Sequence, residues 1–365
     1  MWPKLRTVRY ARAWLAGPTD FADEEVTLER GNQRVAGTLT RPRQGRGPFP
    51  AWVVLHGITR RGRAHPQLQR FTRALVQSGA VAIVPEVPEW RNFELAPALA
   101  VPTIKAAIAG LRESGWARDA PVGVFGFSFG APHAIAATAH PDLAAGLAGS
   151  VGFGAYCSLE RTIRFLMTGT HEWEGRTHRT TPDAYGRWII AANYLTAVPE
   201  HADGGDVARA LRALASVAGD SGISSLDPRL DAHKAELRVS LAEEHQQLFD
   251  LFAPASDVLP DALRGAWVAE ALAAAARRLD PAGEPLEALG RVTRPVHILH
   301  GRNDRLIPFS EGLRLRDALP AGTSARATIT RLFGHSGEES FLAALRSMRE
   351  LPDFLGALRS VLRIV

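Results

Sequence analysis

The feature that most constrains the fold is a regular alternation of short apolar runs with longer segments of helical periodicity. Ala51–Leu55 and Val81–Pro85 are nearly continuous apolar runs, as expected for strands that are buried on both faces. Helical spacing follows each run, at Pro66–Ser78 and at Ala98–Gly115. Strands joined by crossover helices and short turns form a parallel sheet covered by helices on both faces. The sequence therefore predicts an α/β fold, with its ligand site at the carboxyl ends of the strands.

Further strands extend the predicted sheet on both sides. Glu24–Leu28 and Arg34–Arg41 alternate apolar and polar residues around the turn at Gly31-Asn32, which predicts an antiparallel pair. Gly146–Gly154 is a glycine-rich apolar run that predicts one more strand. The central sheet is therefore expected to be mostly, but not entirely, parallel.

A candidate nucleophile lies where a predicted strand meets a predicted helix. The apolar run Pro121–Phe125 leads into Gly126-Phe127-Ser128-Phe129-Gly130, and the helical pattern Ala131–Ala139 follows. A serine in this setting occupies a tight strand-to-helix turn, and small residues two positions before and after it keep the turn free of clashes. The pattern G-x-S-x-G alone is a weak signal, and the flanking strand and helix give it its value.

Candidate partners for this serine follow two predicted strands near the C-terminus. Ala327–Phe333 alternates like a strand and is followed by His335, which would accept the Ser128 proton and return it to the leaving group. The apolar run Val296–His300 is followed by Asp304, which would orient the imidazole and stabilise the imidazolium. The sequence thus predicts a triad of nucleophile, base and acid at one edge of the sheet.

Donors for an oxyanion are expected in the turn after Ala51–Leu55, which reads His56-Gly57-Ile58-Thr59. The backbone N–H of Ile58 would act together with that of Phe129 to bind the negative oxygen of a tetrahedral intermediate.

These motifs resemble those of the α/β-hydrolase superfamily: His-Gly after one strand, G-x-S-x-G after a later one, then G-x-x-D-x-x-x-P and G-H-S. The order Ser, Asp, His along the chain is the order found in that family. The resemblance covers residues 24 to 156 and 291 to 365. It implies an α/β-hydrolase fold and a lid-bearing, esterase-like serine hydrolase that needs no cofactor and no metal.

The resemblance also implies a division of the chain into a core and an insertion. Residues 1–157 and 291–365 would form the two parts of the core, and the mostly helical residues 158–290 would form a lid or cap. Helices are expected at five places: Leu159–Met167, Asp183–Val198, Asp206–Ala218, Arg229–Phe252 and Asp261–Leu279. The alternative is a helical layer with no role in access to the site.

Several residues are candidates for contact with a substrate. Glu86 and Trp90 follow the Val81–Pro85 strand at the expected edge of the sheet. Candidates from the predicted lid are aromatic: Trp173, Tyr185, Trp188, Tyr194 and Trp267. Aromatic residues at helical spacing are more often plain core, and loop carboxylates are more often solvated. A metal site at His171 and His178 is not favoured, because the run lacks the H-E-x-x-H spacing.

The triad residues also have structural interpretations. Ser128 would then be part of an ordinary tight turn, Asp304 a helix cap and His335 a solvated loop residue. Glu160 is a rival acid, because it follows the preceding predicted strand, but Asp304 fits the position better.

Composition limits the classes of partner and the compartment. The 365 residues carry a formal charge of +5, but lysine is almost absent and the arginines are interspersed with acids, so nucleic-acid binding is not expected. Cys157 is the only cysteine, which excludes intramolecular disulfides. No long apolar stretch and no signal-like N-terminus is apparent, so we expect a cytoplasmic protein without a membrane span. The oligomeric state is left open.

The function expected from these residues is acyl transfer to water through a Ser128 acyl-enzyme, with a carboxylic ester as the leading substrate class. A small-molecule substrate with an apolar portion would suit the large insertion. Thioester, amide or carbon–carbon bond hydrolysis and acyl transfer to an alcohol remain alternatives on the same triad. A noncatalytic binding protein of this fold is a further alternative.

Overall fold

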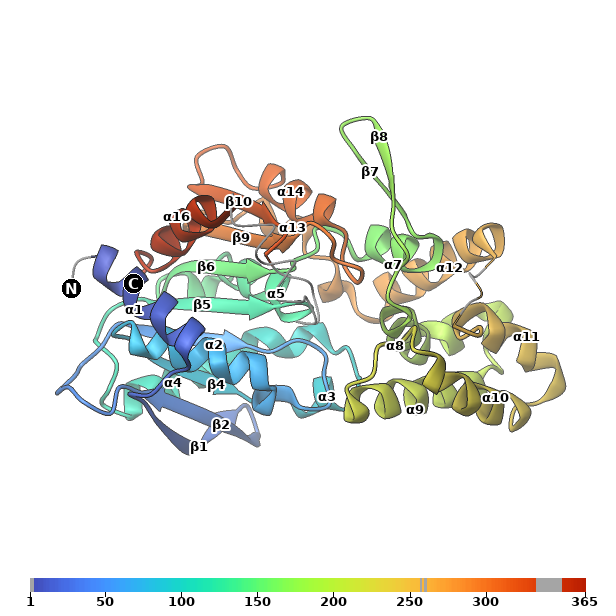
Figure 1. Ribbon diagram of the computed structural model, residues 1–365, viewed down its shortest axis with the longest axis horizontal. Helices are drawn as coiled ribbons and strands as arrows, with labels where there is room; N and C mark the ends of the chain where they lie inside the picture. Colours follow the sequence, from blue (N-terminus) through green and yellow to red (C-terminus); the bar gives the residue numbers. More distant parts are fainter. Residues whose placement is uncertain (1–2, 257, 259–260, 333–349) are drawn as a thin grey trace.

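The computed structural model describes residues 3–256, 258, 261–332 and 350–365. Its centre is an eight-stranded sheet in the order β1-β2-β4-β3-β5-β6-β9-β10 (Figure 1). The strands are β1 Ala22–Arg30, β2 Gln33–Arg41, β3 Ala51–Leu55, β4 Val81–Pro85, β5 Val122–Phe127, β6 Leu147–Phe153, β9 Val296–Gly301 and β10 Ala325–Thr330. The six strands from β4 to β10 pair in parallel, and β1 and β2 extend the sheet in antiparallel fashion. The predicted mostly parallel sheet is confirmed.

Helices cover both faces of this sheet, as predicted. The first group is α1 Pro3–Ala16, α2 Pro66–Gln77 and α16 Leu351–Val361, and the second is α4 Ala100–Glu113, α5 Gly130–Ala137 and α14 Phe309–Asp317. Strand β3 shows why both faces are apolar: Trp52 and Val54 pack with the first group, whereas Val53 and Leu55 pack in the core on the other side. Side chains of a strand alternate between the two faces of a sheet, so a strand without polar residues is one that is buried on both faces.

A long segment leaves the sheet after β6 and returns at β9, although these two strands are hydrogen-bonded neighbours. Its main elements are α7 Leu159–Thr168, β7 Thr170–Trp173, β8 Arg176–Arg179, α8 Ala184–Tyr194, α9 Gly205–Ser221, α10 Asp231–Val239, α11 Glu243–Phe252 and α12 Ala262–Leu279. Figure 1 shows this group of elements beyond one end of the sheet. Short helices complete the fold at α3 Pro88–Arg91, α6 Pro141–Ala144 and α13 Leu286–Leu289.

Two local features of this segment differ from the expectation. The single helix predicted over Arg229–Phe252 is two helices, because Ala242 has an extended ψ of 142° and its N–H donates to Asp206. The segment also contains the antiparallel hairpin β7–β8, where helices alone were expected. Its turn at Glu174-Gly175 has positive φ at both positions, which is the geometry of a two-residue hairpin connection.

Candidate active site

Ser128 occupies a strained turn between β5 and α5. Its φ is +51°, which is unusual for a residue with a side chain, and its N–H donates to the Phe153 carbonyl at 2.8 Å. A Cβ added to Gly126 would lie 2.7 Å from the Ala131 Cα, and one added to Gly130 would lie 2.6 Å from the His56 carbonyl oxygen. The two glycines of the motif are therefore required by the close approach of backbone segments.

The turn after β3 packs directly against this serine. A Cβ on Gly57 would lie 2.9 Å from the Ser128 Cβ, so only glycine allows the two segments to approach so closely. Ile58 and Phe129 both line the cavity that contains Ser128. Their backbone amides donate to no acceptor in the described part of the chain. The structure thus brings both predicted oxyanion residues to the serine.

His56 lies beneath the turn and is completely buried. Its Nδ1 is 2.7 Å from the Gly57 carbonyl oxygen, and its Nε2 accepts from the Val87 N–H at 3.1 Å. The Glu86 carboxylate lies 3.1 Å from the same Nε2. These contacts hold the imidazole inside the core, so His56 fixes the path of the turn.

Asp304 lies in the loop after β9 and is almost fully buried. Its Oδ1 accepts the N–H groups of Leu306 and Ile307, both at 2.9 Å, and its Oδ2 is 3.5 Å from His300 Nε2. Hydrogen bonds from backbone amides stabilise the ionised form of a carboxylate. The rival acid Glu160 is instead half-exposed at the start of α7 and pairs with Arg277.

His335, the predicted base, lies outside the described residues. The nearest described residue before it is Leu332, which lines the same cavity as Ser128.

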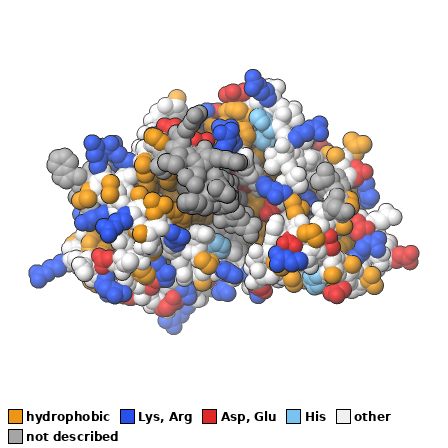
Figure 2. Space-filling view, in the orientation of Figure 1, with side chains coloured by type: hydrophobic (Ala, Val, Ile, Leu, Met, Phe, Trp, Pro, Cys, Tyr) orange, Lys and Arg blue, Asp and Glu red, His pale blue; other side chains and the backbone are white. Residues whose placement is uncertain are grey.

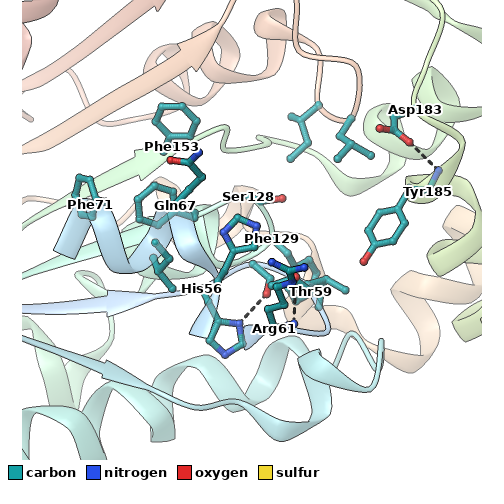
Figure 3. A pocket seen from close by; sticks show the side chains of 18 of the residues that line it. His56, Thr59, Arg61, Gln67, Phe71, Ser128, Phe129, Phe153, Asp183 and Tyr185 are labelled. Carbon is teal, nitrogen blue, oxygen red and sulfur yellow. Dashed lines mark hydrogen bonds between the residues drawn. The ribbon is translucent and has the colours of Figure 1, made fainter. Parts of the chain in front are cut away.

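The cavity has a volume of about 660 Å³ and is bordered by both the sheet and the inserted segment. Figure 3 shows Ser128 with Phe129 and the turn after β3 on one side, and Asp183 and Tyr185 at the start of α8 on another. Apolar residues of the insertion make up much of its wall: Leu159 and Leu166 from α7, Ile189 and Ile190 from α8, and Ala218 from α9. Space of this size and character suits a substrate with an apolar portion.

Of the predicted substrate-contacting residues, Tyr185 lines the cavity. Its ring packs edge-on against Phe93, and burial is the main cause that raises the pKa of its hydroxyl, so it is a neutral hydrogen-bonding group. The other candidates do not line this cavity.

Glu86 and Trp90 lie beneath the turn after β3, away from the cavity wall. Glu86 contacts His56, Arg63 and Arg91. Trp90 is fully buried and meets His56 and Phe129 edge-on. Both side chains therefore contact His56, and Trp90 also contacts Phe129, the residue after Ser128.

The remaining aromatic candidates belong to the packing of the insertion. Trp188 is fully buried and donates to the Phe252 carbonyl at 2.9 Å. Tyr194 donates to Asp280 at 3.0 Å, and Trp267 is half-exposed. Trp173 lies on the hairpin beneath the guanidinium of Arg314. Tyr185 and Trp188 share helix α8, but only Tyr185 faces the cavity.

Asp183 and Arg61 are among the polar residues of the cavity that sequence reasoning missed. Asp183 caps the start of α8: its carboxylate accepts from the Tyr185 N–H at 3.0 Å and from the Ser225 hydroxyl. Arg61, in the dense arginine run after the oxyanion turn, also lines the cavity. The cap was visible as an aspartate before a helical pattern, but nothing local showed which way it would face.

In the described chain, no group of three or more His, Cys, Asp or Glu side chains is arranged to hold a metal ion. The rings of His171 and His178 stack across the hairpin with their centroids 4.9 Å apart, and the Ser310 hydroxyl oxygen is 3.0 Å from His171 Nδ1. No described helix combines the length and apolar character needed to cross a membrane. Figure 2 shows Lys and Arg side chains interspersed with acidic and apolar ones over the face drawn.

Comparison with known proteins gives structural likeness only. No protein-family model and no curated protein matches the sequence. Among solved structures, a mutant of esterase rPPE is similar at a TM-score of 0.50 and 15% identity, over 99% of this chain and 88% of that one. The 2,6-dihydroxy-pseudo-oxynicotine hydrolase is similar at a TM-score of 0.49 and 16% identity, over 98% of this chain and 73% of that one.

The first match is the acylaminoacyl peptidase of Pyrococcus horikoshii, at a TM-score of 0.48 and 12% identity. It covers 93% of this chain, but this chain spans only 42% of the peptidase. The likeness to the esterase rPPE mutant, at a TM-score of 0.50 and 15% identity, shows a common fold and leaves activity open.

Proposed function

We propose that this chain, which has the α/β-hydrolase fold, is a serine hydrolase that cleaves a carboxylic ester through a Ser128 acyl-enzyme. The observation that carries the proposal is the φ of +51° at Ser128, in a turn that faces a cavity of about 660 Å³. Strained backbone is costly, and it is found where function needs a side chain in one place. The two flanking glycines and Gly57 serve only to make this strained turn possible.

In the proposed reaction, the Ser128 Oγ attacks the ester carbonyl carbon while His335 takes the hydroxyl proton. The tetrahedral oxyanion accepts hydrogen bonds from the Ile58 and Phe129 amides. Collapse expels the alcohol, which leaves with the proton held by His335. Water then attacks the acyl-enzyme by the same route and releases the acid and free Ser128.

Asp304 is proposed to orient His335 and to stabilise the imidazolium. Its two hydrogen bonds from backbone amides fix the buried carboxylate and favour its ionised form. A preorganised carboxylate of this kind costs no reorganisation when the neighbouring charge develops.

We also propose that residues 158–290 act as a lid over the serine. Three of its helices, α7, α8 and α9, contribute residues to the cavity wall. The Asp183 N–H donates to the Arg305 carbonyl at 2.8 Å, which ties the start of α8 to the loop that carries Asp304. The lid would therefore close over the acyl or alcohol portion of the substrate.

The proposal is tested by labelling with a fluorophosphonate serine probe. We expect stoichiometric labelling of the folded protein and complete loss of labelling in Ser128→Ala, because the probe reports an activated hydroxyl. A panel of p-nitrophenyl esters, a thioester and an anilide then separates ester hydrolysis from the other acyl bonds. Folded protein that neither reacts with the probe nor hydrolyses any ester would contradict the proposal.

A further inference from the structure

A groove rich in arginine lies next to the Ser128 cavity. It has a volume of about 670 Å³, and we call it the arginine groove. Five arginines line it: Arg60, Arg61, Arg63, Arg73 and Arg91. The first three belong to the dense run that follows the oxyanion turn and has no place in the proposed reaction.

Four of these five arginines are neutralised by carboxylates of the chain. Arg60 pairs with Asp220 at 3.2 Å, and Arg73 pairs with Asp23 at 2.7 Å. Arg63 pairs with Glu25 at 2.7 Å, and Arg91 lies 3.5 Å from Glu86. These contacts explain why the groove holds its shape with so many cations in it.

Arg61 differs from the other four in two ways. Its guanidinium pairs with no carboxylate among the described residues, where its hydrogen bonds are made by the backbone: its N–H donates to the Thr59 hydroxyl at 3.4 Å, and its carbonyl accepts from the Ala64 N–H at 2.8 Å. Among the arginines of the groove, it is also the one that lines the Ser128 cavity. An exposed guanidinium with no carboxylate partner in the described part of the chain therefore borders the proposed site of reaction.

The positive charge of Arg61 acts on a titratable group that lines the cavity. His65, which also lines it, has a pKa lowered first by burial and then by the positive charge of Arg61. The opposing carboxylate, Asp183, is engaged as the cap of α8 by the Tyr185 N–H and the Ser225 hydroxyl. The wall near Arg61 thus presents positive charge, and the far wall presents a carboxylate that already accepts hydrogen bonds.

We propose that Arg61 selects an ester that carries a carboxylate group, by binding that group at the junction of the cavity and the arginine groove. This inference rests on the proposed ester hydrolysis at Ser128. A guanidinium can donate two parallel hydrogen bonds to a carboxylate, which gives direction as well as attraction. The apolar wall then holds the rest of the substrate, and the carboxylate sets its orientation relative to Ser128.

The test compares matched anionic and neutral esters. In the leaving-group arm, 4-acetoxybenzoate is compared with 4-acetoxybenzamide; in the acyl arm, mono-4-nitrophenyl adipate is compared with 4-nitrophenyl hexanoate. The quantity compared is kcat/KM for the anionic ester divided by kcat/KM for the neutral one. We expect Arg61→Gln to lower this ratio about tenfold in one of the two arms, the one whose carboxylate reaches Arg61. The wild-type ratio should also fall with rising salt, because the cation is exposed.

Arg73→Gln is the matched control. It removes the same charge from the same groove, but Arg73 does not line the cavity and pairs with Asp23. This variant should keep the wild-type ratio in both arms. An equal fall in both variants would show a general field effect and would overturn the role given to Arg61.

Binding to Ser128→Ala separates the two proposals. In this background, calorimetry measures the dissociation constants of the same esters without turnover. Tighter binding of the anionic ester that is lost on adding Arg61→Gln supports the inference even if hydrolysis itself is not found. Ser128-dependent hydrolysis with a ratio that Arg61→Gln leaves unchanged overturns the inference and leaves the proposed function standing.

Discussion

The strained turn at Ser128 shows how few residues define the candidate site. The backbone at Ser128 adopts a left-handed φ because β5 must pass directly into α5. Glycines at 126 and 130 remove the side chains that would meet neighbouring backbone. Such a requirement acts over five consecutive residues, which is why the sequence alone predicted it.

On the segment that faces Ser128, the close approach of Gly57 gives a testable prediction. In Gly57→Ala, the new Cβ would lie 2.9 Å from the Ser128 Cβ and 3.2 Å from the Phe127 carbonyl oxygen. We expect the oxyanion turn to shift away from Ser128 and kcat/KM for esters to fall about a hundredfold, as for loss of one oxyanion donor. Esterase kinetics, with thermal denaturation to confirm folding, measure the effect.

Gly322→Ala is the control, because a Cβ there meets nothing within 4 Å. It should retain wild-type kinetics. Unchanged turnover in Gly57→Ala would show that the turn after β3 takes no part in the reaction.

At the scale of elements, a buried carboxylate joins the core to the insertion. Glu311, in the first turn of α14, accepts the N–H groups of Cys157 and Ser158 at 3.0 and 2.8 Å. It also pairs with Arg161 of α7 at 2.7 Å. The start of the insertion is therefore fixed by a helix that lies about 150 residues later in the chain.

We expect Glu311→Gln to lower the free energy of unfolding by about 1 to 3 kcal/mol. The amide oxygen can still accept both backbone N–H groups, which share Oε2 of the carboxylate, but the amide NH2 then replaces the Oε1 that accepts from Arg161, and the charge of Arg161 loses its partner. The range is discounted because Arg161 is 40% exposed and is screened by solvent. Urea denaturation measures the change.

Glu160→Gln is a matched control from the adjacent helix. Glu160 pairs with Arg277, but both side chains are about half-exposed, so its loss should cost less than about 1 kcal/mol. Equal losses in the two variants would mean that burial of Glu311 contributes nothing to the junction.

Local periodicity described the elements well where each was one continuous pattern. The strands at Ala51–Leu55 and Val81–Pro85 have the predicted bounds. The break between α10 and α11 was missed, because it depends on a bond from Ala242 to Asp206 in another helix. The hairpin β7–β8 was missed because its stacked histidines pack on Phe309, which lies outside the segment.

For the whole molecule, buried histidines predict a dependence of stability on pH. Burial lowers the pKa of His133, His171 and His297 to about 4. Between pH 6.5 and 4, the unfolded chain binds protons at these sites and the folded chain does not. Stability should therefore fall as the pH falls through this window, by up to about 1.4 kcal/mol per pH unit for the fully buried His133 and by less for His171 and His297, which solvent partly screens.

His133→Gln should flatten this dependence, because one of the three titrating groups is removed. His245→Gln is the control: hydrogen bonding to Asp206 raises the pKa of His245, so its contribution is complete below pH 6.5 and is lost as the pH rises above it. Denaturant titrations at pH 7, 6, 5 and 4.5 measure the free energy of unfolding of both variants. Parallel curves for wild type and His133→Gln would contradict the assignment.

The α/β sheet, the turn at Ser128 and the places of Asp304 and of the proposed oxyanion residues could be predicted from local patterns, because each follows from a strand end and its next few residues. The surroundings of Ser128 depend instead on tertiary packing. Tyr185 faces the cavity and Trp188, on the same helix, does not. Arg61 borders the cavity without a carboxylate partner among the described residues, whereas Arg60 and Arg63 are paired. Such differences depend on packing between segments that are more than a hundred residues apart in the sequence, and local patterns do not predict that packing.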